Sequence, residues 1–416
     1  MDKISSKKKR IYLCLAHPGG KEQDYIRKAF EDDWIAPLGP NVDGFEDDLK
    51  QFLGGEKEVL AVSSGTAAVH LGLVGCGVGP GDEVIAQTFT FCASVNPIVY
   101  LGAKPILVDS EKETWNMDPD LLEEAINDRI SKTGRTPKAI VPVSLYGMPY
   151  KVDRILEIAD KYGIPVVEDS AEALGSRFDG KALGTFGRFG VLSFNGNKMI
   201  TTSGGGALIC PDPETKKTML HYATQAREPF PYYQHENLGY NYRLSNVCAG
   251  IGRGQMLVAD EHVRHHHKVA KMYAELLKDI PGIQVHGNPS PQIDSNFWLS
   301  TIVLNPELHV RGQEESPSGE TSCEPNPNVI TLIRQLDAAG IETRPLWKPM
   351  HLQPLYKDAP YYCGAKSISE NLFKAGLCLP SGPRVYEVDV KFICNMIKEL
   401  IDDCHGGAYQ RHHPGP

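Results

Sequence analysis

The feature that most constrains the fold is a series of short apolar runs between residues 57 and 210, separated by segments with helical spacing. The runs are EVLAV, EVIAQ, KPILVD, KAIVPVSL, IPVVED, FGVLSF and GALIC. Such runs are typical of strands that are buried on both faces, and helices between them indicate a mostly parallel sheet with helices on both sides. We therefore expect a doubly wound α/β domain.

Two of the intervening helices carry clear end signals. Asp118 followed by Pro119 predicts the cap and first turn of a helix over LLEEAIND, and VDRILEIADKYG has helical spacing that ends at Gly163. After about residue 245 the pattern changes to one long expected helix, LSNVCAGIGRGQMLVADEHVRHHHKVAKMYAELLKDI, followed by further strands and helices.

The domain organisation that we expect is an N-terminal arm over residues 1–20, a large α/β domain over 21–255 and a smaller α+β domain over 256–416. Residues 311–328 are rich in Pro, Ser and Glu and lack periodicity, so they are expected to form an exposed insertion or lid, and the last dozen residues are expected to fray.

Composition excludes several classes of function. A net charge of −9 gives no broad basic surface for nucleic acid or anionic lipid. No stretch of about 18 apolar residues is present, so no membrane span is expected. The basic N-terminus lacks the apolar length and cleavage site of a signal peptide, which predicts a cytoplasmic protein. The ten cysteines form no CxxC pair and are expected to be free thiols.

Candidate ligand-binding groups follow the predicted strands, because ligands of open α/β sheets bind outside the carboxyl ends of the strands. Ser63, Ser64, Gly65 and Thr66 follow the first run and open a helix, where free N–H groups suit a phosphate, although a plain helix cap would look the same. Glu168 and Asp169 end the fifth run, and a buried carboxylate there needs a partner such as a protonated ring nitrogen. A cap of the following helix is the alternative for the carboxylate.

A lysine and two aromatic residues complete this set. Lys198 lies in SFNGNKMITTSGGGAL, after Ser193 and before three glycines, and a desolvated lysine can form a Schiff base with an aldehyde. In TFTFCAS, Phe89 and Phe91 fall on alternating faces, so one of them could stack on a planar ring. A solvated loop lysine and two core aromatics are the alternatives. Together, the anion cradle, carboxylate, aromatic ring and lysine are the groups that pyridoxal phosphate requires.

Longer motifs over nearly the whole chain resemble those of a known family. They are IAPLGPNVDGFE, SSGTAAVHLGL, TFTFCAS, VEDSAEALGSRFDGKALGTFG, SFNGNKMITTSGGG, GYNYRLSN, ETRPLWKPMH and CLPSG. The family is the DegT/DnrJ/EryC1/StrS group of pyridoxal phosphate-dependent nucleotide-sugar aminotransferases. The resemblance implies fold type I, with a mostly parallel seven-stranded sheet in the large domain and a smaller α+β domain.

The resemblance also implies roles for individual residues. Lys198 would form the Schiff base, Asp169 would hold the pyridine nitrogen protonated, and Phe91 would stack on the ring. The phosphate would bind to Ser64, Gly65, Thr66 and Ser193. A homodimer with shared active sites is implied, in which Asn241 reaches the phosphate in the partner subunit. The candidates for contacts with the nucleotide-sugar or the donor carboxylate are Glu172, Arg243, Arg344, Trp347 and His351.

Shorter motifs favour one subgroup of this family. AEALGS, NGNK, TTSGGG, TQARE and ETRPLWKPMH resemble aminotransferases of the bacillosamine route. Glu172 lies where many family members have Gln or His, and this subgroup resembles the chain in having Glu, near the sugar and cofactor. The implied reaction transfers the amino group of L-glutamate, through pyridoxamine phosphate, to UDP-2-acetamido-2,6-dideoxy-hexos-4-ulose. The products are a UDP-4-amino-4,6-dideoxy sugar and 2-oxoglutarate.

Several alternatives remain open at this point. Another aminotransferase could act on a GDP- or dTDP-linked keto-sugar or at carbon 3. A dehydratase on the same scaffold would have histidine in place of Lys198. A non-catalytic protein could bind the cofactor or a nucleotide-sugar without turnover. His262 and His266 have a spacing that can bind a metal, but no third ligand is evident, so we expect a solvated helix face and no metal.

Overall fold

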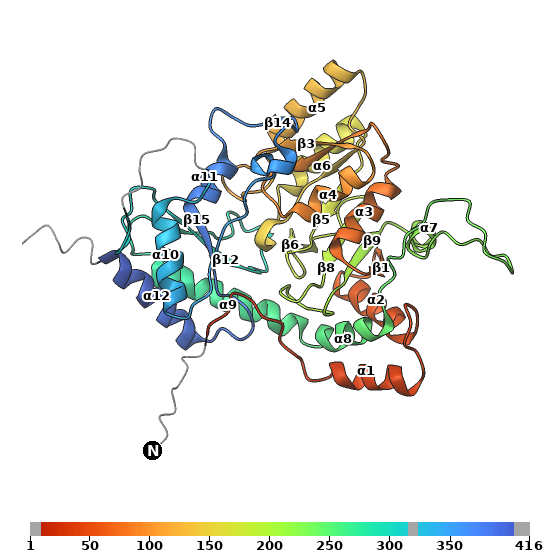
Figure 1. Ribbon diagram of the computed structural model, residues 1–416, viewed down its shortest axis with the longest axis horizontal. Coiled ribbons are helices and arrows are strands. Elements are labelled where there is room, and N and C mark those ends of the chain that lie inside the picture. The colour runs from red at the N-terminus through yellow and green to blue at the C-terminus, as the bar shows by residue number, and fades with distance from the viewer. Residues whose placement is uncertain (1–9, 315–322, 403–416) are drawn as a thin grey trace, which may run out of the picture.

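The large sheet contains all seven of the apolar runs. The computed structural model describes residues 10–314 and 323–402 (Figure 1). The strands are β1 (Glu58–Val62), β2 (Glu83–Gln87), β3 (Lys104–Val108), β4 (Ala139–Val141), β5 (Val167–Asp169), β8 (Phe189–Ser193) and β9 (Gly206–Cys210). Parallel bridges from Ile140 to Val166 and from Val143 to Asp169 join β4 to β5. The sheet order is therefore β1-β9-β8-β5-β4-β2-β3, and the short strand β14 (Tyr361–Tyr362) extends it beside β3.

One strand of this sheet runs against the others. β9 is antiparallel to both β1 and β8, whereas the remaining pairs are parallel, so the expected mostly parallel sheet is confirmed. The connection from β8 to β9, residues 194–205, contains no helix, and without a crossover helix a strand returns antiparallel to its neighbour. Lys198 lies in this connection.

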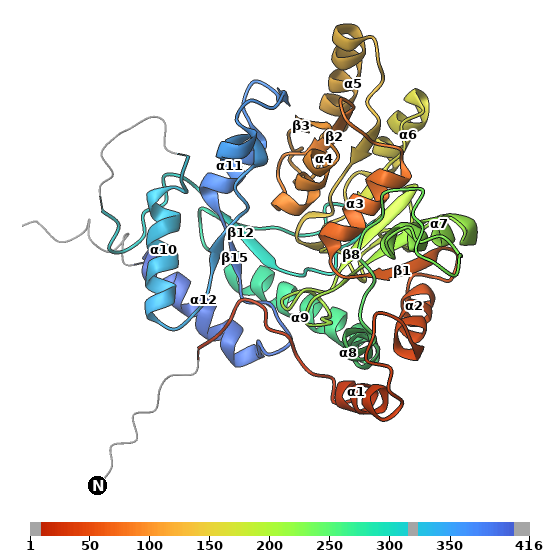
Figure 2. The same ribbon diagram turned by 45° about the vertical axis from the view of Figure 1, so that its right-hand side comes forward.

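Helices cover both faces of the large sheet (Figures 1 and 2). In β2, Val84 and Ala86 pack in the core with α3 (Gly65–Gly75), α4 (Asn96–Tyr100) and α7 (Pro213–Ala223), whereas Ile85 points to the opposite core, with α5 (Pro119–Thr133) and α6 (Val152–Tyr162). This alternation is what a strand buried on both faces requires. The predicted cap is confirmed, because the Asp118 side chain accepts hydrogen bonds from two N–H groups of α5, and Gly163 ends α6 in the left-handed conformation.

The long helix expected after residue 245 is wrong, because the structure has two helices, α8 (Asn246–Met256) and α9 (Ala259–Leu277). They pack against different partners: α8 contacts α1 (Glu22–Glu31) and α2 (Pro40–Phe52), and α9 contacts a second sheet and the C-terminal helix. In α8, Gly252 faces the ring of Phe45 and Gly254 faces the backbone of Glu22, where a β-carbon would lie within 3 Å of either neighbour. The apolar spacing of the sequence continues across residues 257 and 258, but the two helices pack against different partners. This difference explains the break between them.

The second sheet is antiparallel and lies beside the large sheet, with α8 and α9 running along the bottom of both (Figures 1 and 2). Its order is β10 (Ile283–Val285), β12 (Ser300–Leu304), β15 (Gly376–Leu379) and β13 (Arg344–Pro345). It shares an apolar core with α9, α10 (Pro327–Ala338) and α12 (Glu387–Asp402). The predicted boundary at 255/256 falls at the end of α8, and the division into domains stays a prediction.

Short elements complete the chain. A small sheet joins β11 (Ile293–Asp294), β6 (Arg177–Phe178) and β7 (Lys181–Ala182), and α11 (Ile368–Ala375) precedes β15. The 3₁₀ helices are η1 (Cys92–Ser94), η2 (Leu145–Gly147), η3 (Met350–Leu352) and η4 (Pro354–Tyr356).

Residues 1–9, 315–322 and 403–416 lie outside the described residues. They include part of the N-terminal arm, the middle of the expected insertion and the whole of the dozen-residue tail that is expected to fray. In the described part of the arm, Ile11 pairs with Ile341 beside the second sheet. No helix within the described ranges is long and apolar enough to cross a bilayer.

Candidate active site

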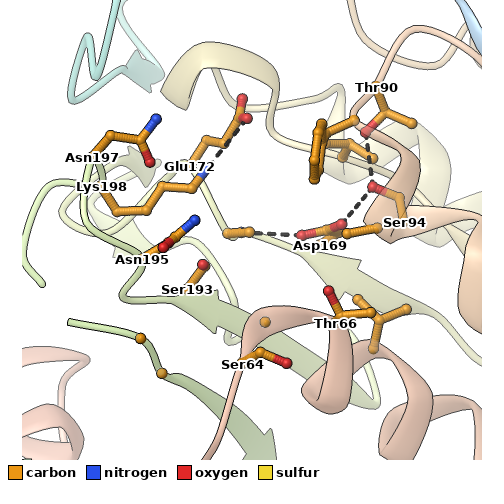
Figure 3. Close-up of a pocket in the computed structure, with 18 of the residues that line it drawn as sticks. Ser64, Thr66, Thr90, Ser94, Asp169, Glu172, Ser193, Asn195, Asn197 and Lys198 are labelled. Atoms are coloured by element: carbon orange, nitrogen blue, oxygen red, sulfur yellow. Dashed lines mark hydrogen bonds and ion pairs between the residues drawn. The ribbon is translucent and has the colours of Figure 1, made fainter. Parts of the chain in front are cut away.

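A cavity of about 320 Å³ lies at the carboxyl ends of β5 and β8 and at the start of α3 (Figure 3). It collects residues that are far apart in the sequence. The predicted site residues that line it are Ser64, Gly65, Thr66, Phe91, Asp169, Glu172, Ser193, Lys198 and Trp347. The place agrees with the general position of ligand sites in open α/β sheets.

The two carboxylates that end β5 have different surroundings. Glu168 accepts hydrogen bonds from the N–H groups of Gly184 at 2.6 Å, Phe186 at 3.0 Å and Gly187 at 3.3 Å, and therefore holds a turn against the sheet. Asp169 lines the cavity instead. Successive strand residues point to opposite faces, which explains why only the second of the two carboxylates reaches the site.

The carboxylate of Asp169 is buried and bound only through neutral donors in the described contacts. Its Oδ2 accepts a hydrogen bond from the Ser94 hydroxyl at 2.6 Å, and its Oδ1 accepts one from the Ala171 N–H at 3.1 Å (Figure 3). Burial raises the pKa of this carboxyl group, against the effect of these donors and of Lys198. A cationic ring N–H placed in the cavity would offset that desolvation, so the site fits a protonated pyridine ring.

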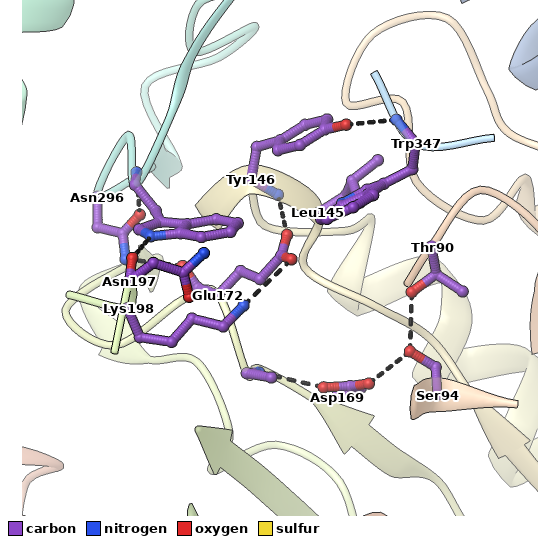
Figure 4. A network of polar contacts seen from close by, with 12 residues as sticks. Thr90, Ser94, Leu145, Tyr146, Asp169, Glu172, Asn197, Lys198, Asn296 and Trp347 are labelled. Atoms are coloured by element: carbon purple, nitrogen blue, oxygen red, sulfur yellow. Dashed lines mark hydrogen bonds and ion pairs between the residues drawn. The ribbon is translucent and has the colours of Figure 1, made fainter. Parts of the chain in front are cut away.

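Lys198 points into the cavity from the turn between β8 and β9 (Figure 4). Its Nζ lies 3.3 Å from Glu172 Oε1 and 4.0 Å from the centre of the Trp298 ring. The indole N–H of Trp298 donates to Asn197 O at 2.7 Å, which fixes the ring against the lysine turn. With 14% of its side chain exposed, Lys198 is not the solvated loop residue that was the alternative.

The start of α3 forms one wall of the cavity beside Ser193. Ser64 caps the helix by accepting the N–H of Ala67 at 3.0 Å, and the first N–H groups of a helix have no partner within it. A β-carbon on Gly65 would lie 3.0 Å from Ser193 Cβ, and one on Gly206 would lie 2.4 Å from the Ser64 backbone. The two glycines thus allow a close approach of helix and strands that leaves N–H groups and hydroxyls around a position suited to phosphate.

The two phenylalanines of TFTFCAS occupy different environments. Phe89 is fully buried in the core, whereas Phe91 is 50% exposed and lines the cavity. The ring of Phe91 lies 5.2 Å from that of Trp347, centre to centre. One of the pair is therefore available to a planar ligand, and the core alternative is correct for the other.

Four of the predicted contact residues do not line this cavity. Arg243 forms an ion pair with Glu46, and Arg344 one with Glu342 at 2.7 Å. Asn241 pairs with Thr224 in the connection between α7 and α8.

His351 shares a hydrogen bond with Thr88 at 2.7 Å and one with Glu370 at 3.1 Å. It also stacks on Tyr361 at 3.7 Å between ring centres, and burial lowers its pKa. The roles of these four residues stay predictions.

The structure adds residues that the sequence analysis missed. Thr90 and Ser94 form a hydrogen-bonded pair at 2.8 Å that leads to Asp169, and Asn195, Asn197 and Trp298 surround Lys198. Both asparagines precede the lysine within the motif NGNK, so their proximity in the sequence was a usable signal. Trp298 comes from a distant segment, and no local pattern could have placed it.

The helix that carries His262 and His266 corrects another expectation. Both side chains are buried, at 4% and 0% exposure, and do not form a solvated face. They share hydrogen bonds with the carbonyl oxygens of Met199 and Phe297, each at 3.1 Å, and burial lowers the pKa of His266 to about 3. Within the described ranges, no group of three or more His, Cys, Asp or Glu residues could hold a metal ion.

Comparisons with known proteins agree with this geometry. A model of the DegT/DnrJ/EryC1/StrS aminotransferase family matches residues 18–398. EpsN of Bacillus subtilis (strain 168), described as a pyridoxal phosphate-dependent aminotransferase, is 45% identical over 94% of this chain and 96% of its own length. The GDP-perosamine synthase of Escherichia coli O157:H7 is 35% identical over 94% of this chain and 99% of its own.

A solved structure shows the same fold. A family aminotransferase from Brucella abortus has a TM-score of 0.81 and 29% identity, and the match covers 92% of this chain and 95% of that one. The predicted fold type I architecture is thereby confirmed, and so is the cofactor expected for the family, pyridoxal phosphate. With a lysine and a buried carboxylate facing one cavity, and with these matches over most of its length, the chain belongs to the DegT/DnrJ/EryC1/StrS aminotransferase family.

Proposed function

We propose that this chain is a pyridoxal phosphate-dependent aminotransferase that transfers the amino group of L-glutamate to carbon 4 of a UDP-linked 4-keto-6-deoxy sugar. The observation that carries the proposal is that Lys198 and Asp169 line one cavity, beside the start of α3. Each of these groups matches one part of the cofactor: amine to aldehyde, carboxylate to ring nitrogen, and helix start to phosphate.

The side chains around the cavity divide the work of the reaction. When bound, pyridoxal phosphate supplies the aldehyde that carries the amino group and the ring that takes up electrons from the reacting carbon. Lys198 Nζ accepts the proton from the α-carbon of L-glutamate and later donates one to carbon 4 of the sugar. Asp169 keeps the facing ring nitrogen protonated, and Ser64, Gly65, Thr66 and Ser193 hold the phosphate.

Three aromatic side chains form part of the remaining wall. Phe91, Trp298 and Trp347 line the cavity and reduce the water around Lys198. Exclusion of water strengthens the electrostatic contacts of the lysine and the carboxylate with the reacting groups. Arg243, Arg344 and His351 remain proposed contacts for the nucleotide-sugar or the donor carboxylate, and Glu172 for the cofactor and sugar.

A second candidate function, which differs in the nucleotide carried by the sugar substrate, has specific support. The motifs AEALGS, NGNK and ETRPLWKPMH favour a UDP-linked substrate of the bacillosamine type. The 35% identity to a GDP-perosamine synthase favours a GDP-linked keto-sugar instead. We rank the UDP-linked sugar first because its motifs surround Lys198 and Glu172 themselves.

We further propose a homodimer in which the connection between α7 and α8 contributes to the partner's site. This connection extends away from the body of the molecule (Figure 1), and Tyr232, Tyr233 and Leu238 on it are 61%, 78% and 79% exposed. Several large apolar side chains in one exposed segment are typical of a protein interface. Asn241, at the end of this segment, would then reach the partner's phosphate site.

A product assay tests the proposed reaction. The purified chain, pyridoxal phosphate and L-glutamate are incubated separately with a UDP-linked and a GDP-linked 4-keto-6-deoxy sugar, and amino-sugar and 2-oxoglutarate are quantified by mass spectrometry. We expect the UDP-amino sugar and 2-oxoglutarate in equal amounts, and neither with Lys198→Ala. A preference for the GDP-linked sugar would move the second candidate to the front, and an equal yield from Lys198→Ala would refute the role of the lysine.

A further inference from the structure

A second carboxylate lies directly beside the amine of Lys198. Glu172 Oε1 is 3.3 Å from Lys198 Nζ, and the two side chains are 5% and 14% exposed. Ion pairs in such surroundings are screened much less by water and salt than surface pairs. The proton-transfer scheme above uses Lys198 and Asp169 but gives no task to this contact.

Glu172 is held in place at both its side chain and its backbone (Figure 4). Its Oε2 accepts the N–H of Tyr146 at 2.7 Å, and its carbonyl oxygen accepts a hydrogen bond from the side-chain amide of Asn296 at 3.0 Å. Tyr146 adopts φ 55° and ψ 17°, a left-handed conformation that is rare for a bulky residue. Strained backbone of this kind persists where the surrounding structure requires it, and here it directs an N–H at the carboxylate.

The other titratable groups that face Glu172 come from three further elements. Burial raises the pKa of the Glu172 carboxyl group, Lys198 lowers it, and Asp169 on β5 raises it further by a smaller effect. The Tyr146 phenol on η2 and the Cys378 thiol on β15 are kept neutral, because burial raises the pKa of both. Lys198 is therefore the cation that balances Glu172 among these groups.

We propose that Glu172 is a positioning residue that pairs with the ammonium ion formed when the free amine of Lys198 accepts a proton, and that fixes its direction beside Trp298. The inference rests on the proposed function, in which the amine is free during the second half of the reaction and must then donate a proton. In the first half of the reaction Nζ would take the proton from the donor α-carbon and pass it to the cofactor carbon that carries the amino group. In the second half it would take a proton from that carbon and donate it to carbon 4 of the sugar, paired with Glu172 each time it is an ammonium ion. The protons balance over the cycle, and Glu172 itself neither gains nor loses one.

The test measures the amine directly rather than turnover. In the full-length chain freed of cofactor, acylation of Lys198 by limiting acetic anhydride is followed by peptide mass spectrometry at pH 8, with Lys216 as an internal reference. Glu172→Gln keeps the size and the acceptor for Tyr146 N–H but removes the charge. We expect Lys198 to react about tenfold faster in this variant, because an opposite charge favours the protonated, unreactive amine.

A matched control is available outside the cavity. Glu111 is a buried carboxylate, 8% exposed, that accepts the N–H of Thr114 at 2.7 Å and does not line the cavity. Glu111→Gln should leave the acylation rate of Lys198 unchanged. A rate in Glu172→Gln equal to that of the wild type would overturn the proposal.

Two further measurements keep the proposal testable if Glu172→Gln does not fold. Glu172→Asp retains the charge on a shorter side chain and should stay within about threefold of the wild-type rate. In the wild type alone, the rate should still rise about tenfold per pH unit through pH 8, and a plateau below that pH would contradict a protonated amine. If the acylation rates of Lys198 differ between the variants as expected but no sugar is aminated, the proposed function would be refuted and this role of Glu172 would stand.

Discussion

Asp169 carries a cost in stability that its proposed role explains. Burial raises the pKa of its carboxyl group in the folded state. The free energy of unfolding therefore falls as pH rises from the pKa of the unfolded chain through this raised pKa. The folded chain without cofactor is therefore expected to bear an uncompensated buried charge at neutral pH. Binding of a cationic ring would remove this cost, so the same residue would couple cofactor binding to stability.

A substitution that cannot ionise tests this cost. Asp169→Asn keeps one acceptor, for the Ala171 N–H, and its new amide can donate to Ser94 if that hydroxyl turns toward Thr90. The cofactor-free variant should therefore be more stable than the wild type at pH 7.5, by on the order of 1 kcal/mol. The gain should shrink as pH falls below the raised pKa, where the wild-type carboxyl is protonated too. Urea unfolding of both proteins at pH 7.5 and pH 4 measures it. A variant less stable than the wild type at pH 7.5 would contradict the account, and amination by the variant should be lost in either case.

At this scale, sequence reasoning identified the residues that a local motif marks. Lys198 beside its glycines and Asp169 at the end of a strand could be found because each lies at a strand end with unusual neighbours. Ser94 and Trp298 could not, because a serine in a short helix and a tryptophan before a strand carry no local signal. Their function depends on which distant residue the fold brings to them.

Among the elements, the contact of α3 with β8 and β9 is the one that shapes the phosphate position. It depends on two glycines, and a third in the same turn offers a control. Gly206→Ala would place a β-carbon 2.4 Å from the Ser64 backbone, whereas a β-carbon on Gly204 meets nothing within 4 Å. The same change from glycine to alanine is therefore expected to disturb the packing at Gly206 and to leave it intact at Gly204, two residues away.

We expect Gly206→Ala to cost about 1–3 kcal/mol of stability, as overpacking typically does, and to weaken cofactor binding by displacing the start of α3. Gly204→Ala should stay within about 0.5 kcal/mol of the wild type. Thermal unfolding and a fluorescence titration with pyridoxal phosphate measure the two effects. If both variants lose affinity equally, the glycine turn itself rather than its contact with α3 would be the determinant.

The elements also show where periodicity fails. All seven apolar runs became strands because a buried strand needs a continuous apolar stretch wherever it lies in the sheet. The break between α8 and α9 was missed because the apolar spacing continues through Leu257 and Val258, while the two helices pack on different parts of the molecule. The buried His262 and His266 were missed for the same reason, since a helix between two cores has no solvated face at these positions.

At the scale of the whole molecule, the proposed dimer would build each active site from residues of both subunits. If Lys198 and Asn241 act at the same site from different subunits, Lys198→Ala and Asn241→Ala should each abolish or strongly reduce activity. In a mixed dimer one site then carries both substitutions and the other carries neither. Denatured and refolded together in equal amounts, the two variants should recover about a quarter of wild-type activity, since half of the dimers are mixed.

The controls for this experiment are each variant refolded alone and the two variants mixed without denaturation. Activity in the co-refolded sample alone supports sites built from two subunits. No recovery, with both variants folded and dimeric by light scattering, would place Asn241 and Lys198 of one subunit at the same site or remove Asn241 from it.

The arrangement of the second sheet is the part of the molecule that sequence reasoning described least well. Its strands β10 and β13 are short, and β12 pairs with β15 across a long stretch of chain, so neither length nor spacing revealed their order. The sheet contributes to the site through Trp298, just before β12, and Trp347, just after β13. The parts of the cavity that sequence reasoning found thus come mainly from the large sheet, and Trp298, which it missed, depends on how the two sheets meet.

The most direct test of the central claim is the absorption spectrum of the purified protein with pyridoxal phosphate, recorded before and after addition of L-glutamate. The account predicts a visible band from the cofactor bonded to Lys198, which glutamate converts to a band of the amine form at shorter wavelength. Lys198→Ala should lack the first band while still binding the cofactor through the phosphate position. A wild-type protein that shows no such band, or a band that glutamate leaves unchanged, would contradict the account.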